Sequence, residues 1–239
     1  MNYLIQADGL TKVYKKRHVI RNISLTIYPG EVIGIIGPNG AGKSTTLDLL
    51  LGLRRPDQGT VTYGHPELYR RIGVQLQSTP FFPGYSALEN MRLFAAFYGV
   101  RLKTDAIMGL LAQCGLEEAA RTDAFRLSGG QQKRLAIAMT LVHDPSLVFL
   151  DEPTAALDPR ARREIRELIA LLAKSGTSVV FTSHDMEEVY KLATRIVMID
   201  GGILRADGRP EDLLNEYGAS GLEELYVQLT EPIRKEEWA

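Results

Sequence analysis

A glycine-rich segment at residues 37–45, GPNGAGKST, has the residue types whose spacing most clearly serves chemistry. It matches the phosphate-binding pattern G-x-x-x-x-G-K-[ST] and lies between the apolar run VIGII and a helical pattern, which is the context that this motif requires. Glycines allow a tight turn that aims successive backbone N–H groups at an anion beside a helix N-terminus. A chance glycine-rich turn is the weaker alternative. We expect the segment to bind the phosphates of a nucleotide through Gly37, Pro38, Asn39, Gly40, Ala41, Gly42, Lys43, Ser44 and Thr45.

Two side chains of this segment have expected roles of their own. Lys43 is expected to reach the β- and γ-phosphates as a mobile positive charge. The hydroxyl of Ser44 is a candidate ligand for Mg²⁺, a hard cation that prefers oxygen.

A second candidate set follows the apolar run LVFL at residues 147–150, where Asp151 and Glu152 stand. A buried strand would deliver both carboxylates to the carboxyl edge of a parallel sheet, where ligands bind in open α/β folds. Asp151 is a candidate partner of Mg²⁺, and Glu152 is a candidate base for the attacking water. Alone, this string would fit an acid-rich turn equally well, and only its pairing with the phosphate-binding segment favours the catalytic interpretation.

These residues need a framework of strands and helices. Short β-branched runs predict buried strands, and apolar positions at helical spacing predict helices 42–51 and 160–174, the latter with Ile165, Leu168, Ile169 and Leu172 on one face. Residues 3–29 alternate without helices, which predicts an antiparallel sheet, and residues 86–143 are expected to be almost wholly helical from a Ser86–Glu89 capping box onward. The buried strands are expected at 31–36, 147–150, 178–182 and 195–199.

Composition limits the classes of function. The 239 residues carry a net charge of −1, and this balance argues against nucleic-acid binding. The single cysteine, Cys114, excludes an intrachain disulfide and a cysteine-rich zinc site, and it is expected to be buried. No segment approaches the roughly 18 apolar residues of a membrane-spanning helix, and the N-terminus lacks the pattern of a secretory signal. We therefore expect a cytosolic chain whose membrane role, if any, comes through a partner.

The string LSGGQ, 20 residues ahead of LVFLDE and just before a helical stretch at 133–143, resembles the signature of the ATP-binding-cassette (ABC) family. The resemblance implies that Tyr14 stacks on adenine, although it could simply pack on the early sheet. It implies that Gln77 touches Mg²⁺ and senses the membrane partner, although Gln75 is close enough to confuse the alignment. It implies that His184 lies near the γ-phosphate, although it could be a helix cap beside Asp185. The signature residues are Leu127, Ser128, Gly129, Gly130 and Gln131, and Asp158 matches a carboxylate at the dimer seam.

The family resemblance also implies an architecture. We expect an α/β P-loop NTPase core with a mostly parallel sheet, an added N-terminal antiparallel β-subdomain and an inserted helical subdomain at roughly 80–145. The cassette would span residues 3–230, with a short tail at 231–239. The stretch between residues 60 and 71 looks shorter than in many relatives.

The implied activity is hydrolysis of ATP with Mg²⁺ in a dimer, which we expect to consist of two identical chains, whose signature residues act in trans on the partner's nucleotide. The chain would drive a separate transmembrane permease from the inner face of the cell membrane. Within the family it resembles the exporters of drugs, antibiotics and ions, partly through an expected C-terminal helix at 221–230. A cassette acting on nucleic acid or ribosomes is the alternative, but one cassette, one cysteine and the lack of a heptad run disfavour it. A regulatory cassette that hydrolyses ATP without transport is a further alternative that the sequence does not exclude.

Three aromatic residues follow Gln77 in a region that receives a coupling helix of the membrane subunit in this family. Phe81, Phe82 and Tyr85 could form that docking surface, or they could pin the helical subdomain to the core. The residues alone favour neither interpretation.

Overall fold

The computed structural model describes residues 3–77 and 81–230. Within them the chain forms two compact units. The first unit comprises residues 3–6, 26–32, 62–77 and 81–183, and the second comprises residues 7–25, 33–61 and 184–230. Two predicted features, the start of the segment after Gln77 and the tail at 231–239, lie outside the described residues.

A parallel ladder forms the centre of the first unit. It consists of β5 (Ile72–Gln75), β6 (Leu147–Asp151) and β7 (Ser178–Ser183), with β6 paired to both neighbours. Every residue of β6 and β7 is buried, as expected for parallel strands that are covered on both faces. The predicted strands 147–150 and 178–182 are therefore confirmed, each one residue longer than expected.

Helix α5 (Pro159–Lys174) confirms the predicted amphipathic helix. Its buried positions include Ile165, Leu168, Ile169 and Leu172, the four residues expected on one face. Its opposite face is solvated and has ion pairs one turn apart, Arg160–Glu164 and Arg163–Glu167. Pairs of this kind are worth only ~0.3–0.5 kcal/mol each, so the buried face provides most of the stabilisation.

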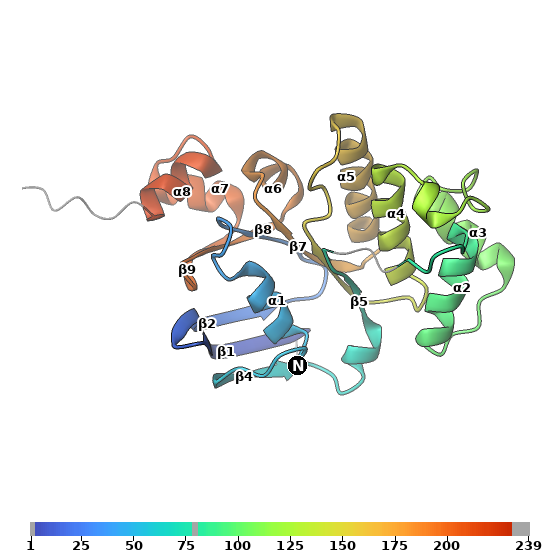
Figure 1. The fold of residues 1–239 in the computed structure, drawn as a ribbon. Coiled ribbons are helices and arrows are strands. Elements are labelled where there is room, and N and C mark those ends of the chain that lie inside the picture. Colours follow the sequence, from blue (N-terminus) through green and yellow to red (C-terminus); the bar gives the residue numbers. More distant parts are fainter. Residues whose placement is uncertain (1–2, 78–80, 231–239) are drawn as a thin grey trace, which may run out of the picture. The chain divides into compact units, whose positions relative to one another are not determined.

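The helical region of the first unit contains α2 (Ala87–Phe97), α3 (Thr104–Gln113) and α4 (Gly129–Thr140), which pack side by side (Figure 1). The Ser86–Glu89 capping box at the start of α2 is confirmed. The expectation of an almost wholly helical stretch was wrong, because α2 and α3 each end before a left-handed glycine, Gly99 and Gly115. Between α3 and α4 only a short 3₁₀ turn, η2 (Ala124–Arg126), is helical, and another, η1 (Leu68–Arg71), precedes β5.

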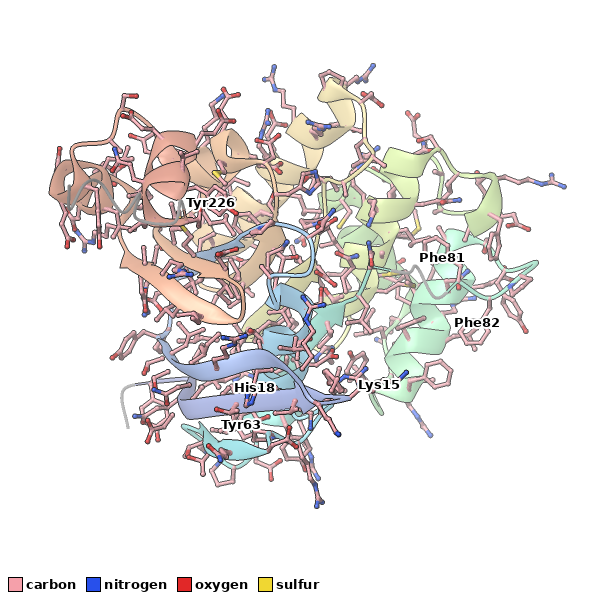
Figure 2. The ribbon with its side chains drawn as sticks, turned by 60° about the vertical axis from the view of Figure 1, so that its left-hand side comes forward. Lys15, His18, Tyr63, Phe81, Phe82 and Tyr226 are labelled. Carbon is pink, nitrogen blue, oxygen red and sulfur yellow. The ribbon has the colours of Figure 1, made fainter. Side chains whose placement is uncertain are left out.

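The antiparallel sheet expected at the N-terminus is present, and most of its residues belong to the second unit. Its strands β1 (Ile5–Tyr14), β2 (Arg17–Ile27) and β4 (Gln58–Tyr63) lie in the order β2-β1-β4. Lys15 and Lys16 both have positive φ, at 46° and 68°, and form the tight turn of the β1–β2 hairpin, where Figure 2 labels Lys15.

The second unit also contains β3 (Val32–Ile36), parallel to β8 (Arg195–Asp200), and β9 (Ile203–Gly208), antiparallel to β8. The strands predicted at 31–36 and 195–199 are thus confirmed, and β9 was not anticipated. Helix α1 (Lys43–Leu50) begins inside the glycine-rich segment, directly after Gly42. Three further helices are α6 (Met186–Leu192), α7 (Pro210–Tyr217) and α8 (Leu222–Thr230), and α8 confirms the expected C-terminal helix. No helix within the described residues is both long and apolar enough to cross a bilayer.

Candidate nucleotide site

The glycine-rich segment forms a loop between β3 and α1 in the second unit. The ammonium of Lys43 donates to the carbonyl oxygens of Gly37 and Pro38, at 2.8 and 3.2 Å, and the side chain is 6% exposed. The hydroxyl of Thr46 donates to the carbonyl oxygen of Gly42 at 3.0 Å and fixes the start of the helix. Pro38, Asn39, Gly40 and Ser44 are exposed. The lysine therefore lies inside the loop while the rim of the loop faces outward.

Two glycines of the loop are required by their surroundings. Gly37 has a φ of 152°, and a Cβ there would collide with the carbonyl oxygen of Ile199. Gly42 has a φ of 110°, and its Cβ would lie 2.7 Å from the Cδ1 of Ile20. A side chain at either position would be strained by the backbone and blocked by its neighbours, so the loop depends on glycine.

Tyr14 is the last residue of β1. The Nζ of Lys12 and the guanidinium carbon of Arg54 lie 5.6 and 5.7 Å from its ring centroid, within the range of cation–π attraction. Its hydroxyl is buried. The ring is therefore held by packing and by two cations, while its contact with adenine stays a prediction.

His184 is exposed and lies in the bend between β7 and α6. The carboxylate of the next residue, Asp185, accepts the N–H of Glu188 at 3.0 Å and is the N-cap of α6. The capping alternative for His184 is therefore wrong, since Asp185 fills that role. The γ-phosphate role of His184 stays a prediction.

The two acids belong to the first unit, at the carboxyl end of β6. Asp151 is 8% exposed, and its Oδ1 accepts the hydroxyl of Thr182 at 2.5 Å. Glu152 has a φ of 48°, in the left-handed region, and its N–H donates to the same hydroxyl oxygen at 2.9 Å. Thr182 was not among the residues singled out from the sequence.

Lys133 is a second residue near the acids that was missed. Its Nζ lies 3.5 Å from the carbonyl oxygen of Glu152. Burial lowers the pKa of Lys133, and the negative charges of Asp151 and Glu152 partly oppose that effect. Nothing in the local sequence distinguishes this lysine, because its approach to the acids depends on the packing of α4.

The signature residues lie at the start of α4: Leu127 precedes the helix, Ser128 is its N-cap, and Gly129, Gly130 and Gln131 begin its first turn. The helix was expected to begin at residue 133, and this boundary was wrong: it begins at Gly129, because Ser128 and Gln131 form a capping box. Leu127 and Gly130 are buried, while Ser128 and Gly129 are exposed. The capping box occupies the N–H groups of Ser128 and Gln131. The positive end of the helix dipole still makes this exposed end of α4 suitable for an anion.

Asp158 is the N-cap of α5. Its Oδ1 accepts the N–H groups of Arg160 and Ala161 at 2.9 and 3.0 Å, and the bond from Ala161 is the largest cause of a lowered pKa of Asp158. A Cβ on Gly130 would lie 2.7 Å from the Cβ of Ala161, so α4 and α5 approach closely at this point. The structure thus brings the signature and the start of α5 together.

The glutamines at and beyond the end of β5 differ in exposure. Gln75 is 4% exposed, and its Nε2 donates to the carbonyl oxygen of Leu76 at 2.5 Å. Gln77 lies two residues beyond the strand and is exposed. The accessible side chain favours Gln77 over Gln75 as a ligand, and its contact with Mg²⁺ stays a prediction.

The aromatic residues after Gln77 divide between packing and exposure. Phe81 is 7% exposed and meets the ring of Phe125 edge-on at 6.1 Å. Phe82 is 36% exposed, and Figure 2 labels it beside the helical region. Its ring contacts Tyr85, Phe94 and Phe97 at centroid distances of 6.3, 6.5 and 5.9 Å. We call the three residues Phe82, Tyr85 and Phe97 the exposed aromatic cluster, since each is at least 36% exposed and the ring of Phe82 contacts the other two.

Known proteins with a similar sequence or fold identify the family. The profile of the family described as ABC transporter matches residues 20–155. The chain is 35% identical to the Nod factor export ATP-binding protein I of Cupriavidus metallidurans, covering 98% of this chain and 80% of that protein. It is 36% identical to the linearmycin resistance ATP-binding protein of Bacillus subtilis, covering 94% and 75%. A bacterial ABC transporter cassette solved as a dimer superimposes with a TM-score of 0.78 at 29% identity, covering 86% and 98%.

Subunits of this family bind and hydrolyse ATP, dimerise and work with membrane-spanning components. The expected fold is confirmed by the solved relatives. The chain belongs to the ABC transporter family, as its ATP-hydrolysing subunit.

Proposed function

We propose that this chain powers export by a separate membrane-spanning permease, which it contacts through the exposed aromatic cluster. The cluster carries the proposal, because large aromatic side chains that are left exposed next to one another are typical of a protein interface. Two relatives named above are an export subunit and a resistance subunit, which favours outward transport. The chain would then lie on the cytoplasmic face of the membrane, held there by the permease and without contact with nucleic acid.

The phosphates of ATP bind to the loop at 37–45. Its exposed rim offers backbone N–H groups at the start of α1, and Lys43 turns from the loop carbonyls to the β- and γ-phosphates. Tyr14 stacks on adenine, and His184 contacts the γ-phosphate.

Hydrolysis depends on Glu152, which orients the attacking water as a general base. The residues present fit a magnesium ion, because Ser44, Asp151 and Gln77 all offer oxygen donors, and one carboxylate oxygen of Asp151 is not taken by Thr182. Bound Mg²⁺ would neutralise charge on the phosphates as the terminal bond breaks.

Two identical chains form the active dimer, in which the signature of one chain covers the nucleotide of the other. The exposed start of α4 faces the partner's γ-phosphate, to which the N–H group of Gly129 donates. Asp158, which caps α5 beside the signature, lies at the seam between the chains.

The permease contact is tested by co-purification from membranes. A tagged chain with Phe82→Ala and Tyr85→Ser should recover at least tenfold less of the membrane-spanning subunit than the wild type, while ATP hydrolysis by the purified chain stays within about twofold. Tyr69→Ser is the matched control, since Tyr69 is 58% exposed and lies outside the cluster. Undiminished recovery by the double variant would refute the proposed contact, and recovery of no membrane protein by the wild type would refute a transport role.

A further inference from the structure

Thr182 occupies a position between the two acids at the end of β6. It is 0% exposed, and the register of β6 and β7 places it directly beside Asp151. Its hydroxyl bonds the side chain of Asp151 and the backbone N–H of Glu152, so one group of β7 contacts both acids.

That hydroxyl makes two hydrogen bonds, one as donor and one as acceptor. A threonine hydroxyl has one hydrogen, and an ionised carboxylate can only accept, so the hydrogen must point to Oδ1 of Asp151, at 2.5 Å. The oxygen can then only accept from its other neighbour, the N–H of Glu152, at 2.9 Å. A single buried atom therefore couples the orientation of the Asp151 carboxylate to the backbone of Glu152.

The backbone of Glu152 needs such support. Its φ of 48° is unfavourable for a residue with a Cβ, and such a conformation persists only where its surroundings determine it. The N–H is held by Thr182, and the carbonyl oxygen has Lys133 at 3.5 Å on its other side. The direction in which the Glu152 side chain leaves β6 therefore depends on the Thr182 hydroxyl.

We propose that Thr182 is a positioning residue for ATP hydrolysis, which fixes Asp151 and Glu152 in one arrangement through its shared hydroxyl. This inference rests on the proposed roles of those two acids. Thr182 is fully buried, and it acts by limiting where the carboxylate of Asp151 and the side chain of Glu152 can lie.

Three variants of the full chain test the role. Thr182→Val keeps the shape and removes the hydroxyl, and it should lower kcat roughly tenfold to a hundredfold with KM for ATP within about twofold, since misplacement of catalytic groups has effects of this size. Thr182→Ser keeps the hydroxyl and should retain kcat within about threefold. Thr140→Val is the matched control, because Thr140 is also buried but its hydroxyl donates to Ile137 within α4. It should lower the melting temperature to a similar extent and leave kcat unchanged.

The outcomes separate this inference from the proposed function. A Thr182→Val chain with kcat within twofold of the wild type would overturn the inference, as would a Thr182→Ser chain that is impaired as strongly as Thr182→Val. An equal loss of kcat in Thr140→Val would also overturn it, because the effect would then follow stability alone. Glu152→Gln is measured in parallel. Wild-type turnover by that variant would overturn the assignment of Glu152 as the base. An inactive Glu152→Gln variant together with an active Thr182→Val variant would refute only the role of Thr182.

Discussion

The phosphate-binding loop and the acidic end of β6 both hold backbone at positive φ, but they do so by different means. In the loop, Gly37 and Gly42 adopt the conformation because they lack a Cβ. At the end of β6, Glu152 has a Cβ and is held there by Thr182, which is 30 residues away in the sequence. The backbone conformation of the loop is therefore determined by its own glycines, whereas that of the acidic end depends on residues that are distant in the sequence.

This difference explains what the sequence could predict. The loop, the buried strands and the apolar face of α5 follow from short patterns, so they were found correctly. The roles of Thr182 and Lys133 follow from the β6–β7 register and from the packing of α4, which no local pattern reveals. The start of α4 was missed although its signal is local, because the S-x-x-Q capping spacing was overlooked within the signature.

The largest expected effect comes from the acidic end. Glu152→Gln should lower kcat by roughly 10² to 10⁴, because it removes the general base, and should leave the Kd for ATP nearly unchanged. Phosphate release under single-turnover conditions and equilibrium binding of ATP measure the two quantities. If the variant lost affinity for ATP as strongly as it lost kcat, the acidic end would serve binding as well as catalysis, and the proposed division of roles would be wrong.

Gly37→Ala tests whether the phosphate-binding loop depends on glycine. The new Cβ meets the carbonyl oxygen of Ile199, so we expect the loop to distort and the Kd for ATP to rise at least about tenfold, or ~1.4 kcal/mol. Gly218→Ala is the control: its φ of 63° is also left-handed but a Cβ there has no neighbour within 4 Å. It should cost only ~1–2 kcal/mol of unfolding free energy and leave ATP binding intact. Normal ATP affinity in Gly37→Ala would show that the loop does not depend on glycine.

The smallest expected effect concerns His143, which lies between α4 and β6 in the first unit. Its ring stacks on Tyr98 at a centroid distance of 3.7 Å, its Nε2 bonds the carbonyl oxygen of Ile72, and burial lowers its pKa. Because the folded pKa lies below the unfolded value of about 6.5, the unfolded state takes up the proton first. Stability is thus full above pH 6.5 and is lost as the pH falls through the folded pKa.

We therefore expect the free energy of unfolding to be lower at pH 5.5 than at pH 7.5. Urea denaturation at the two pH values measures it, and His143→Phe, which keeps an aromatic ring for Tyr98 but cannot titrate, should show a smaller difference. An equal difference in both proteins would assign the pH dependence to other groups.

The central claim is that the loop at 37–45 binds the phosphates of ATP while Glu152 serves the hydrolysis of the bound nucleotide. The most direct test is a crystal structure of the Glu152→Gln chain grown with ATP and Mg²⁺. We expect an intact triphosphate whose oxygens accept backbone N–H groups of the loop, with Lys43 moved from the carbonyl of Gly37 to the phosphates. A nucleotide bound elsewhere, with Lys43 still on Gly37, would contradict the account.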